Sequence, residues 1–186
     1  MLIQNYGLFW RIDRVWWGHP NYTGHLRGYS VRSQKRIADF REQVGLYVLY
    51  DSSFKMIYLG QAGANDQHYL FSRLKEHKND QLAERWSRFS WFGIRAVNKD
   101  CKLGKTPYAR HPSLGDVLNH MEAVLLTAVE PPHNRQGGRF GNKVEQFLQW
   151  RDEEALGPDS DAILRDIHEA VARTTRHAHC SCRYLH

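Results

Sequence analysis

The chain has 186 residues, of which 41% are hydrophobic and 25% charged, and its formal net charge is +6. This composition is ordinary for a globular protein, no apolar run approaches the roughly 20 residues that span a bilayer, and the first residues lack the order of a secretory signal. We therefore expect one cytoplasmic domain over residues 1–186 without membrane contact. The positive charge slightly favours a polyanionic partner such as nucleic acid.

The expected elements follow from the apolar patterning of the chain. Aromatic and β-branched runs predict strands, and apolar residues that recur every three or four positions predict helices. In chain order these are one or two strands in 1–18, a short helix in 31–43, a hairpin in 45–60, a helix in 68–80, a strand in 87–97, and helices in 116–130, 142–155 and 160–175. A long basic loop, 98–116, follows the strand at 87–97.

This order of elements predicts an α+β fold. We expect a small mixed or antiparallel central sheet of about three core strands, flanked by helices. The hairpin and the strand at 87–97 supply these core strands. Within the single domain we distinguish an N-terminal extension (1–44), a core (45–136) and a C-terminal helical extension (137–186).

Each strand of the hairpin carries one tyrosine beside a glycine. A turn centred on Ser52 and Ser53 would place Tyr47 directly opposite Tyr58, with the two side chains about 5 Å apart on the same face. An aromatic pair that only packs is the alternative, and the pair taken alone favours it. The two phenols become candidates for a site only together with other residues.

Four further polar side chains stand out along the chain. Arg73 and His77 are four residues apart, so they share the face of their helix that lies opposite its apolar side. Glu122 lies within the most apolar helix, where a buried carboxylate is costly unless it is paired or binds a cation. Asn134 follows two prolines, a position typical of a turn. A solvated or turn-forming role is the alternative for each of them.

In combination and in this order, these residues resemble the motifs of the GIY-YIG nuclease family. The matching positions are Gly45-Leu46-Tyr47, Tyr58-Leu59-Gly60, Arg73, His77, Glu122 and Asn134. Leucine replaces isoleucine in both tripeptides, which conserves apolar bulk. A histidine one turn after the arginine is typical of the stand-alone restriction endonucleases of that family. The resemblance covers about half of the chain, residues 44–136.

The resemblance implies cleavage of phosphodiester bonds with a single divalent metal ion, Mg²⁺ or Mn²⁺. Tyr47 would be the general base toward the attacking water, and His77 would take the proton onward. A phenol is a poor base near neutral pH, so we expect the metal ion, Arg73 or His77 to lower the pKa of Tyr47. Some family members carry a lysine after the second tripeptide, but this chain has Gln61 there, so that base is lacking.

The remaining positions would bind the phosphate and the metal ion. Arg73 would hold the scissile phosphate through charge-assisted hydrogen bonds, and Tyr58 would orient the phosphate or the water. Glu122 would ligate the metal ion that offsets charge on the 3′ leaving oxygen. Asn134 would brace the site or contact the phosphate.

The expected partner is double-stranded DNA. The loop residues predicted to bind it are Lys99, Lys102, Lys105 and Arg110, and a second candidate set is Arg27, Arg32, Lys35 and Arg36. A homodimer would cut both strands with one site per chain, and a partner protein of a defence system is a further candidate. The resemblance favours restriction or anti-phage defence. The alternatives are a repair or structure-selective nuclease on the same fold, and a catalytically idle nucleic-acid-binding module.

Overall fold

The structure is a computed structural model, which describes residues 2–19, 22–63, 68–105, 113–130, 138, 140–141 and 143–151. The chain divides into two units, Met1–Asp152 and Glu153–His186, and all described residues lie in the first. The helix expected at 160–175 therefore lies outside the described residues. No helix within the described ranges is both long enough and apolar enough to cross a membrane.

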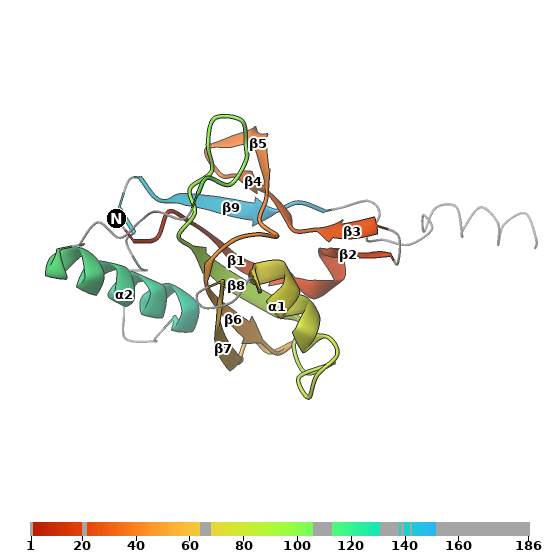
Figure 1. Cartoon of the computed structure of the whole chain (residues 1–186). Helices are drawn as coiled ribbons and strands as arrows, with labels where there is room; N and C mark the ends of the chain where they lie inside the picture. Colours follow the sequence, from red (N-terminus) through yellow and green to blue (C-terminus); the bar gives the residue numbers. More distant parts are fainter. Residues whose placement is uncertain are drawn as a thin grey trace, which may run out of the picture. The chain divides into compact units, whose positions relative to one another are not determined.

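A seven-stranded mixed sheet dominates the described structure, with the strand order β5-β4-β9-β1-β8-β6-β7 (Figure 1). Its strands are β1 (Asn5–Arg11), β4 (Arg27–Ser30), β5 (Ser33–Asp39), β6 (Gly45–Tyr50), β7 (Met56–Ala62), β8 (Arg88–Gly93) and β9 (Glu145–Gln149). A short 3₁₀ helix (Ile12–Arg14) precedes a separate two-stranded sheet of β2 (Trp16–His19) and β3 (Tyr22–His25). The described part of the chain has two α-helices, α1 (Leu70–His77) and α2 (Leu114–Val129).

The expected fold class, a small sheet of about three strands flanked by helices, is wrong. The hairpin and the third core strand do lie side by side as β7, β6 and β8, but four more strands extend the sheet beyond them. Three of these, β1, β4 and β5, come from residues 1–44, and β9 comes from residues 137–186. The segments expected to be extensions thus complete the sheet that the core begins.

Two segments with helical patterns form strands instead. The segment 31–43 contains β5, which pairs antiparallel with β4, and the segment 142–155 contains β9. β9 has a partner on each side, since it runs parallel to β1 and antiparallel to β4, and Phe147 at its centre is fully buried. Helix propensity contributes only a few tenths of a kcal/mol per residue. Pairing along both edges together with burial therefore overrides it.

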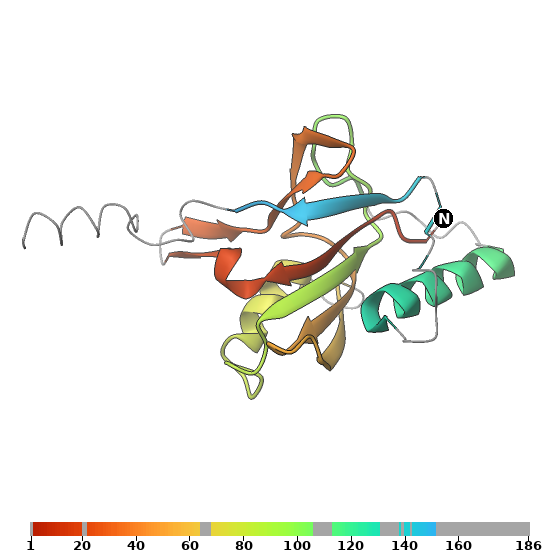
Figure 2. The ribbon, with the colours of Figure 1, turned by 180° about the vertical axis from the view of Figure 1, so that it is seen from behind.

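Each helix covers a different face of the sheet. On β6, Tyr47 belongs to a hydrophobic cluster with Leu74 of α1, whereas the next residue, Val48, belongs to a cluster with Ala123 of α2. Successive strand residues point to opposite faces, so α1 and α2 lie on opposite sides of β6. In Figure 1 α1 lies in front of the sheet, and in Figure 2, seen from behind, the sheet lies in front of α1. Tyr47 therefore faces α1.

Candidate active site

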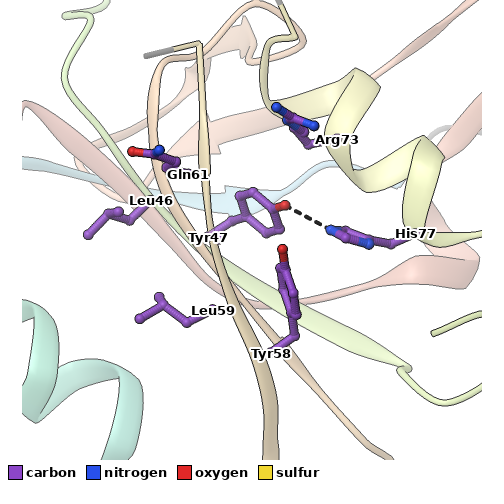
Figure 3. Close-up of a pocket in the computed structure, with 8 residues that line it drawn as sticks. Leu46, Tyr47, Tyr58, Leu59, Gln61, Arg73 and His77 are labelled. Atoms are coloured by element: carbon purple, nitrogen blue, oxygen red, sulfur yellow. Dashed lines mark hydrogen bonds between the residues drawn. The ribbon is translucent and has the colours of Figure 1, made fainter. Parts of the chain in front are cut away.

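An open pocket lies where β6, β7 and α1 meet (Figure 3). Its volume is about 430 Å³, and it is lined by Leu46, Tyr47, Tyr58, Leu59, Gly60, Gln61, Arg73 and His77. The strands supply two phenols, and the helix supplies a guanidinium and an imidazole. The pocket thus brings together four of the six residues that the motif order predicts for the catalytic site.

The two phenols meet through a register that differs from the expected one. Tyr47 pairs with Gly60, and Tyr58 pairs with Leu49, so the prediction that Tyr47 lies directly opposite Tyr58 is wrong. The ladder shifts at Ile57, an extra residue on β7 in the manner of a β-bulge. The phenols are diagonal neighbours on one face, and their ring centroids are 6.0 Å apart.

Gly60 leaves the space that the two rings occupy. A Cβ atom at this position would lie 2.5 Å from the hydroxyl oxygen of Tyr47 and 2.8 Å from Cε1 of Tyr58. We expect Gly60→Ala to displace the buried Tyr47 ring and to lower the free energy of unfolding by about 1–3 kcal/mol. Chemical denaturation measures this change, with Gln61→Ala, at an exposed neighbouring position, as the control. Equal stability of wild type and Gly60→Ala would contradict this packing.

His77 is the centre of a chain of hydrogen bonds. Its Nε2 atom is 2.8 Å from the hydroxyl oxygen of Tyr47, and its Nδ1 atom is 2.7 Å from Oδ2 of Asp80. The backbone amide of Leu82 donates to the other oxygen of Asp80 at 2.7 Å. The indole of Trp86 donates to the carbonyl oxygen of His77 at 3.2 Å. Both the ring and the backbone of His77 are thus held in place.

Burial keeps the Tyr47 phenol protonated. The residue is only 1% exposed. Burial first, and then the neighbouring Tyr58 phenol, raise the pKa of Tyr47 well above the ordinary value of a phenol, and the Arg73 guanidinium only partly opposes this. The described residues therefore raise this pKa, where we expected it to be lowered. At neutral pH Tyr47 can accept a proton only while it gives its own to a neighbour, and Nε2 of His77 is within reach.

Arg73 lies one turn before His77 on α1 and also lines the pocket. Its Nη1 atom donates to Oε2 of Glu76 at 3.1 Å, and Glu76 pairs with His68 at 2.5 Å. Partial burial would raise the pKa of Glu76, but His68 and Arg73 hold this pKa below its ordinary value. The Arg73 side chain is 32% exposed. A carboxylate therefore orients the guanidinium and leaves it accessible to an anion.

Glu122 is not among the residues that line this pocket. It is exposed on α2, whose buried side chains pack on the sheet face opposite to that of Tyr47. Asn134, the sixth predicted residue, lies outside the described residues. The described structure thus supports the grouping of the tyrosines, the arginine and the histidine, but it does not bring the glutamate to them.

The described residues of the pocket do not fit a magnesium centre. No three His, Cys, Asp or Glu side chains in the described ranges gather closely enough to hold a metal ion. The pocket offers phenols, an amide, a guanidinium and an imidazole, whereas Mg²⁺ prefers carboxylate oxygens and water. The described pocket therefore supplies groups for proton transfer and phosphate binding rather than metal ligands.

The two predicted sets of basic residues differ in what their side chains contact. In the loop set, the exposed members are Lys99, Lys102 and Lys105, and Arg110 lies outside the described residues. In the N-terminal set, Arg36 donates to the carbonyl oxygen of Val97 at 2.8 Å, and Arg32 donates to that of Val144 at 3.1 Å. These hydrogen bonds occupy part of each guanidinium. The loop set is therefore the better candidate for contact with phosphates.

Two acidic residues of this site were missed by the sequence analysis. Glu76 and Asp80 each follow a predicted site residue, Arg73 and His77, by three positions. On a helix this spacing brings side chains together. The contact of Glu76 with Arg73 could therefore have been predicted from the sequence. Asp80 lies beyond the end of α1, where helical spacing no longer applies, so only the structure reveals its contact.

Comparisons of the chain with models of protein families, with curated proteins and with solved structures found no match. A function for the pocket therefore depends on the order of the motif residues and on the chemistry of the side chains that the pocket brings together.

Proposed function

We propose that the protein is a divalent-metal-dependent DNA endonuclease of the GIY-YIG type. The observation that carries the proposal is the 2.8 Å contact between the buried Tyr47 hydroxyl and Nε2 of His77, beside Arg73 in an open pocket. A phenol in contact with an imidazole nitrogen provides a path for a proton, and a guanidinium provides a partner for a phosphate. Attack of water on a phosphodiester needs a route for the water's proton and is favoured by a cation at the phosphate.

The proton follows a defined path in this proposal. The attacking water gives a proton to the Tyr47 oxygen while Tyr47 gives its own proton to Nε2 of His77. The water oxygen forms its bond to phosphorus, the bond from phosphorus to the 3′ oxygen breaks, and the 3′ oxygen takes up a proton from solvent. Arg73 holds the non-bridging oxygens. Tyr58, which is 36% exposed, lines the same pocket and orients the phosphate or the water.

The metal ion and the biological role come from the resemblance. The resemblance gives Glu122 as the ligand of Mg²⁺ or Mn²⁺ and Asn134 as a brace of the site. The described structure places the exposed Glu122 side chain outside the Tyr47 pocket, on the helix that packs against the opposite face of the sheet, so this role is tested separately. The proposed substrate is double-stranded DNA, bound along the exposed lysines of the 98–105 loop, and a homodimer would cut both strands. Restriction or anti-phage defence is the proposed role, with or without a partner protein.

Plasmid nicking tests the proposed activity. We expect the wild type to convert supercoiled plasmid to nicked and linear forms in the presence of Mg²⁺ and not in the presence of a chelator. Discrete fragments of phage DNA would indicate restriction, whereas a smear would indicate low sequence specificity. DNA that is bound but never cut, whether modified or unmodified, would contradict the endonuclease and favour an idle binding module.

Glu122→Gln tests the metal ligand separately. Because the side chain is exposed, the substitution leaves the fold intact, and a change in cutting reports on function. If Glu122 has the ligand role that the resemblance implies, half-maximal nicking should require about tenfold more Mg²⁺ in this variant, since an amide is a weaker ligand than a carboxylate. Glu130→Gln, at the exposed end of the same helix, is the charge-matched control. An unchanged Mg²⁺ requirement in Glu122→Gln would place the ligand elsewhere.

A further inference from the structure

We propose that Asp80 is a positioning residue, whose carboxylate holds His77 in the tautomer that accepts the proton of Tyr47. The role of His77 in this proposal rests on the proposed function, but the contact between Asp80 and His77 requires no substrate. Neither the motif order nor the resemblance assigns a role to Asp80. The proposal therefore adds a member to the pocket's proton path from the hydrogen bonds of Asp80.

The tautomer follows from the contacts of the two ring nitrogens. A neutral imidazole carries its proton on one nitrogen and a lone pair on the other. Partial burial opposes ionisation of Asp80, but hydrogen bonds from Leu82 and His77 hold the pKa of Asp80 below its ordinary value. An ionised carboxylate only accepts, so Nδ1, 2.7 Å away, carries the proton. Nε2 then has the lone pair, and the Tyr47 hydroxyl donates to it.

The carboxylate also matters once the proton has moved. The rings of Tyr47 and Tyr58 lie against the imidazole, with centroids 5.7 and 4.6 Å from its own. A proton on Nε2 converts His77 into a cation beside these two phenols. The Asp80 carboxylate at Nδ1 offsets that charge through a charge-assisted hydrogen bond. The same contact thus orients the neutral ring and stabilises the protonated one.

Asp80 is held in position by the turn that follows α1. Its Oδ1 atom accepts from the Leu82 amide at 2.7 Å, and its carbonyl oxygen accepts from the Ala83 amide at 3.0 Å. A residue that only stabilised this turn would need a single side-chain oxygen, to accept from the Leu82 amide. The second oxygen of Asp80 serves His77, and the side chain is still 38% exposed. Asp80→Asn separates the two roles, because its single oxygen can serve Leu82 while its NH₂ group faces Nδ1.

The test combines nuclear magnetic resonance with nicking. In full-length protein with ¹⁵N-labelled histidine, the signals of His77 are assigned by their loss in His77→Gln. We expect the wild type to show the proton on Nδ1 and Asp80→Asn to show it on Nε2, because the amide donates where the carboxylate accepted. Nicking by Asp80→Asn should fall about 10- to 100-fold with an unchanged melting temperature. Glu84→Gln, an exposed acidic position in the same segment, should match the wild type in both measurements.

Each outcome decides one part of the proposal. An unchanged tautomer in Asp80→Asn would overturn the positioning role. If the tautomer of His77 changes in Asp80→Asn while nicking stays at the wild-type rate, Asp80 is not needed for the proton path. If the tautomer changes while even the wild type never cuts nucleic acid, the positioning of His77 is supported, and the proposed nuclease function is the part that fails.

Discussion

Tyr47→Phe should nick plasmid DNA at least about 100-fold more slowly than the wild type. The substitution removes one oxygen atom and keeps the ring that packs in the pocket. That oxygen lies 2.8 Å from Nε2 of His77, and in the proposed path it receives the proton of the attacking water. Without it, the water has no direct route to the imidazole. Single-turnover nicking, with enzyme in excess over plasmid, measures the chemical step apart from DNA binding.

Tyr50→Phe is the matched control for this experiment. Tyr50 lies on the same strand and is as deeply buried as Tyr47, but its hydroxyl donates to the carbonyl oxygen of Ala128 at 2.9 Å on the opposite face. Its loss leaves one carbonyl without this donor and should lower the free energy of unfolding by about 1 kcal/mol. Nicking should remain at the wild-type rate. If Tyr47→Phe also cut at that rate, Tyr47 would be a packing residue and the proposed proton path would be wrong.

The raised pKa of Tyr47 distinguishes two versions of this chemistry. A base that acts as a phenolate would lose its proton before the reaction, and burial followed by the Tyr58 phenol makes that state costly. A phenol that passes its proton to His77 as it receives another never becomes an anion. The described pocket favours this second version. His77 is therefore as necessary to the path as Tyr47, although the tripeptide motifs contain only the tyrosine.

Local patterns were sufficient for the elements that frame the pocket. The hairpin expected at 45–60 forms as β6 and β7, and the apolar spacing near 68–80 forms α1. The apolar segment near 116–130 forms α2, where the side chain of Ser113 accepts from the amide of Asp116 at 3.1 Å as an N-cap. In each of these segments the main signal lies within about 16 consecutive residues.

The extent of the sheet was not predictable from such signals. β9 reaches its place between β1 and β4 only because segments more than 100 residues apart in the chain meet, as in the pairing of Gly7 with Phe147. Its own residues favour a helix, and only the two neighbouring strands supply the hydrogen bonds that reverse this preference. A prediction from local periodicity therefore finds the strands around the tyrosines and misses the larger sheet.

In the candidate site, too, local spacing predicted some features and long-range or irregular geometry determined others. The four-residue spacing of Arg73 and His77 predicted that they share a helix face, and both line the pocket. The register of the tyrosines differs from the expected one by two residues. One comes from the turn, where the Asp51 amide donates to the Lys55 carbonyl, and one comes from the extra residue Ile57, and symmetry about Ser52 and Ser53 reveals neither. The Asp80 contact depends on how the chain turns after α1. Spacing within an element was informative, whereas the geometry of a bulge or a helix end depends on contacts that spacing does not encode.

Gly45→Ala should destabilise the whole protein more than Gly60→Ala, by about 3 kcal/mol or more. Gly45 begins β6 with φ at +153°, a conformation that L side chains rarely adopt. A Cβ atom there would lie 2.0 Å from the carbonyl oxygen of Phe92 on β8. This neighbour is backbone in a paired strand, so it cannot rotate away as a side chain can. The neighbouring strands β6 and β8 would have to separate where β6 begins, two residues before Tyr47.

Urea unfolding of Gly45→Ala and of Gly115→Ala measures this effect against a matched substitution. Gly115 lies in α2, where a Cβ atom would have no neighbouring atom within 4 Å, so alanine there should be neutral or stabilising by up to about 1 kcal/mol. Because Gly45→Ala acts on the strand that carries Tyr47, its nicking should fall with the folded fraction. If the two variants were equally stable, the Phe92 carbonyl oxygen of β8 would not lie close to Gly45 of β6, and the close approach of the two strands at this point would be wrong.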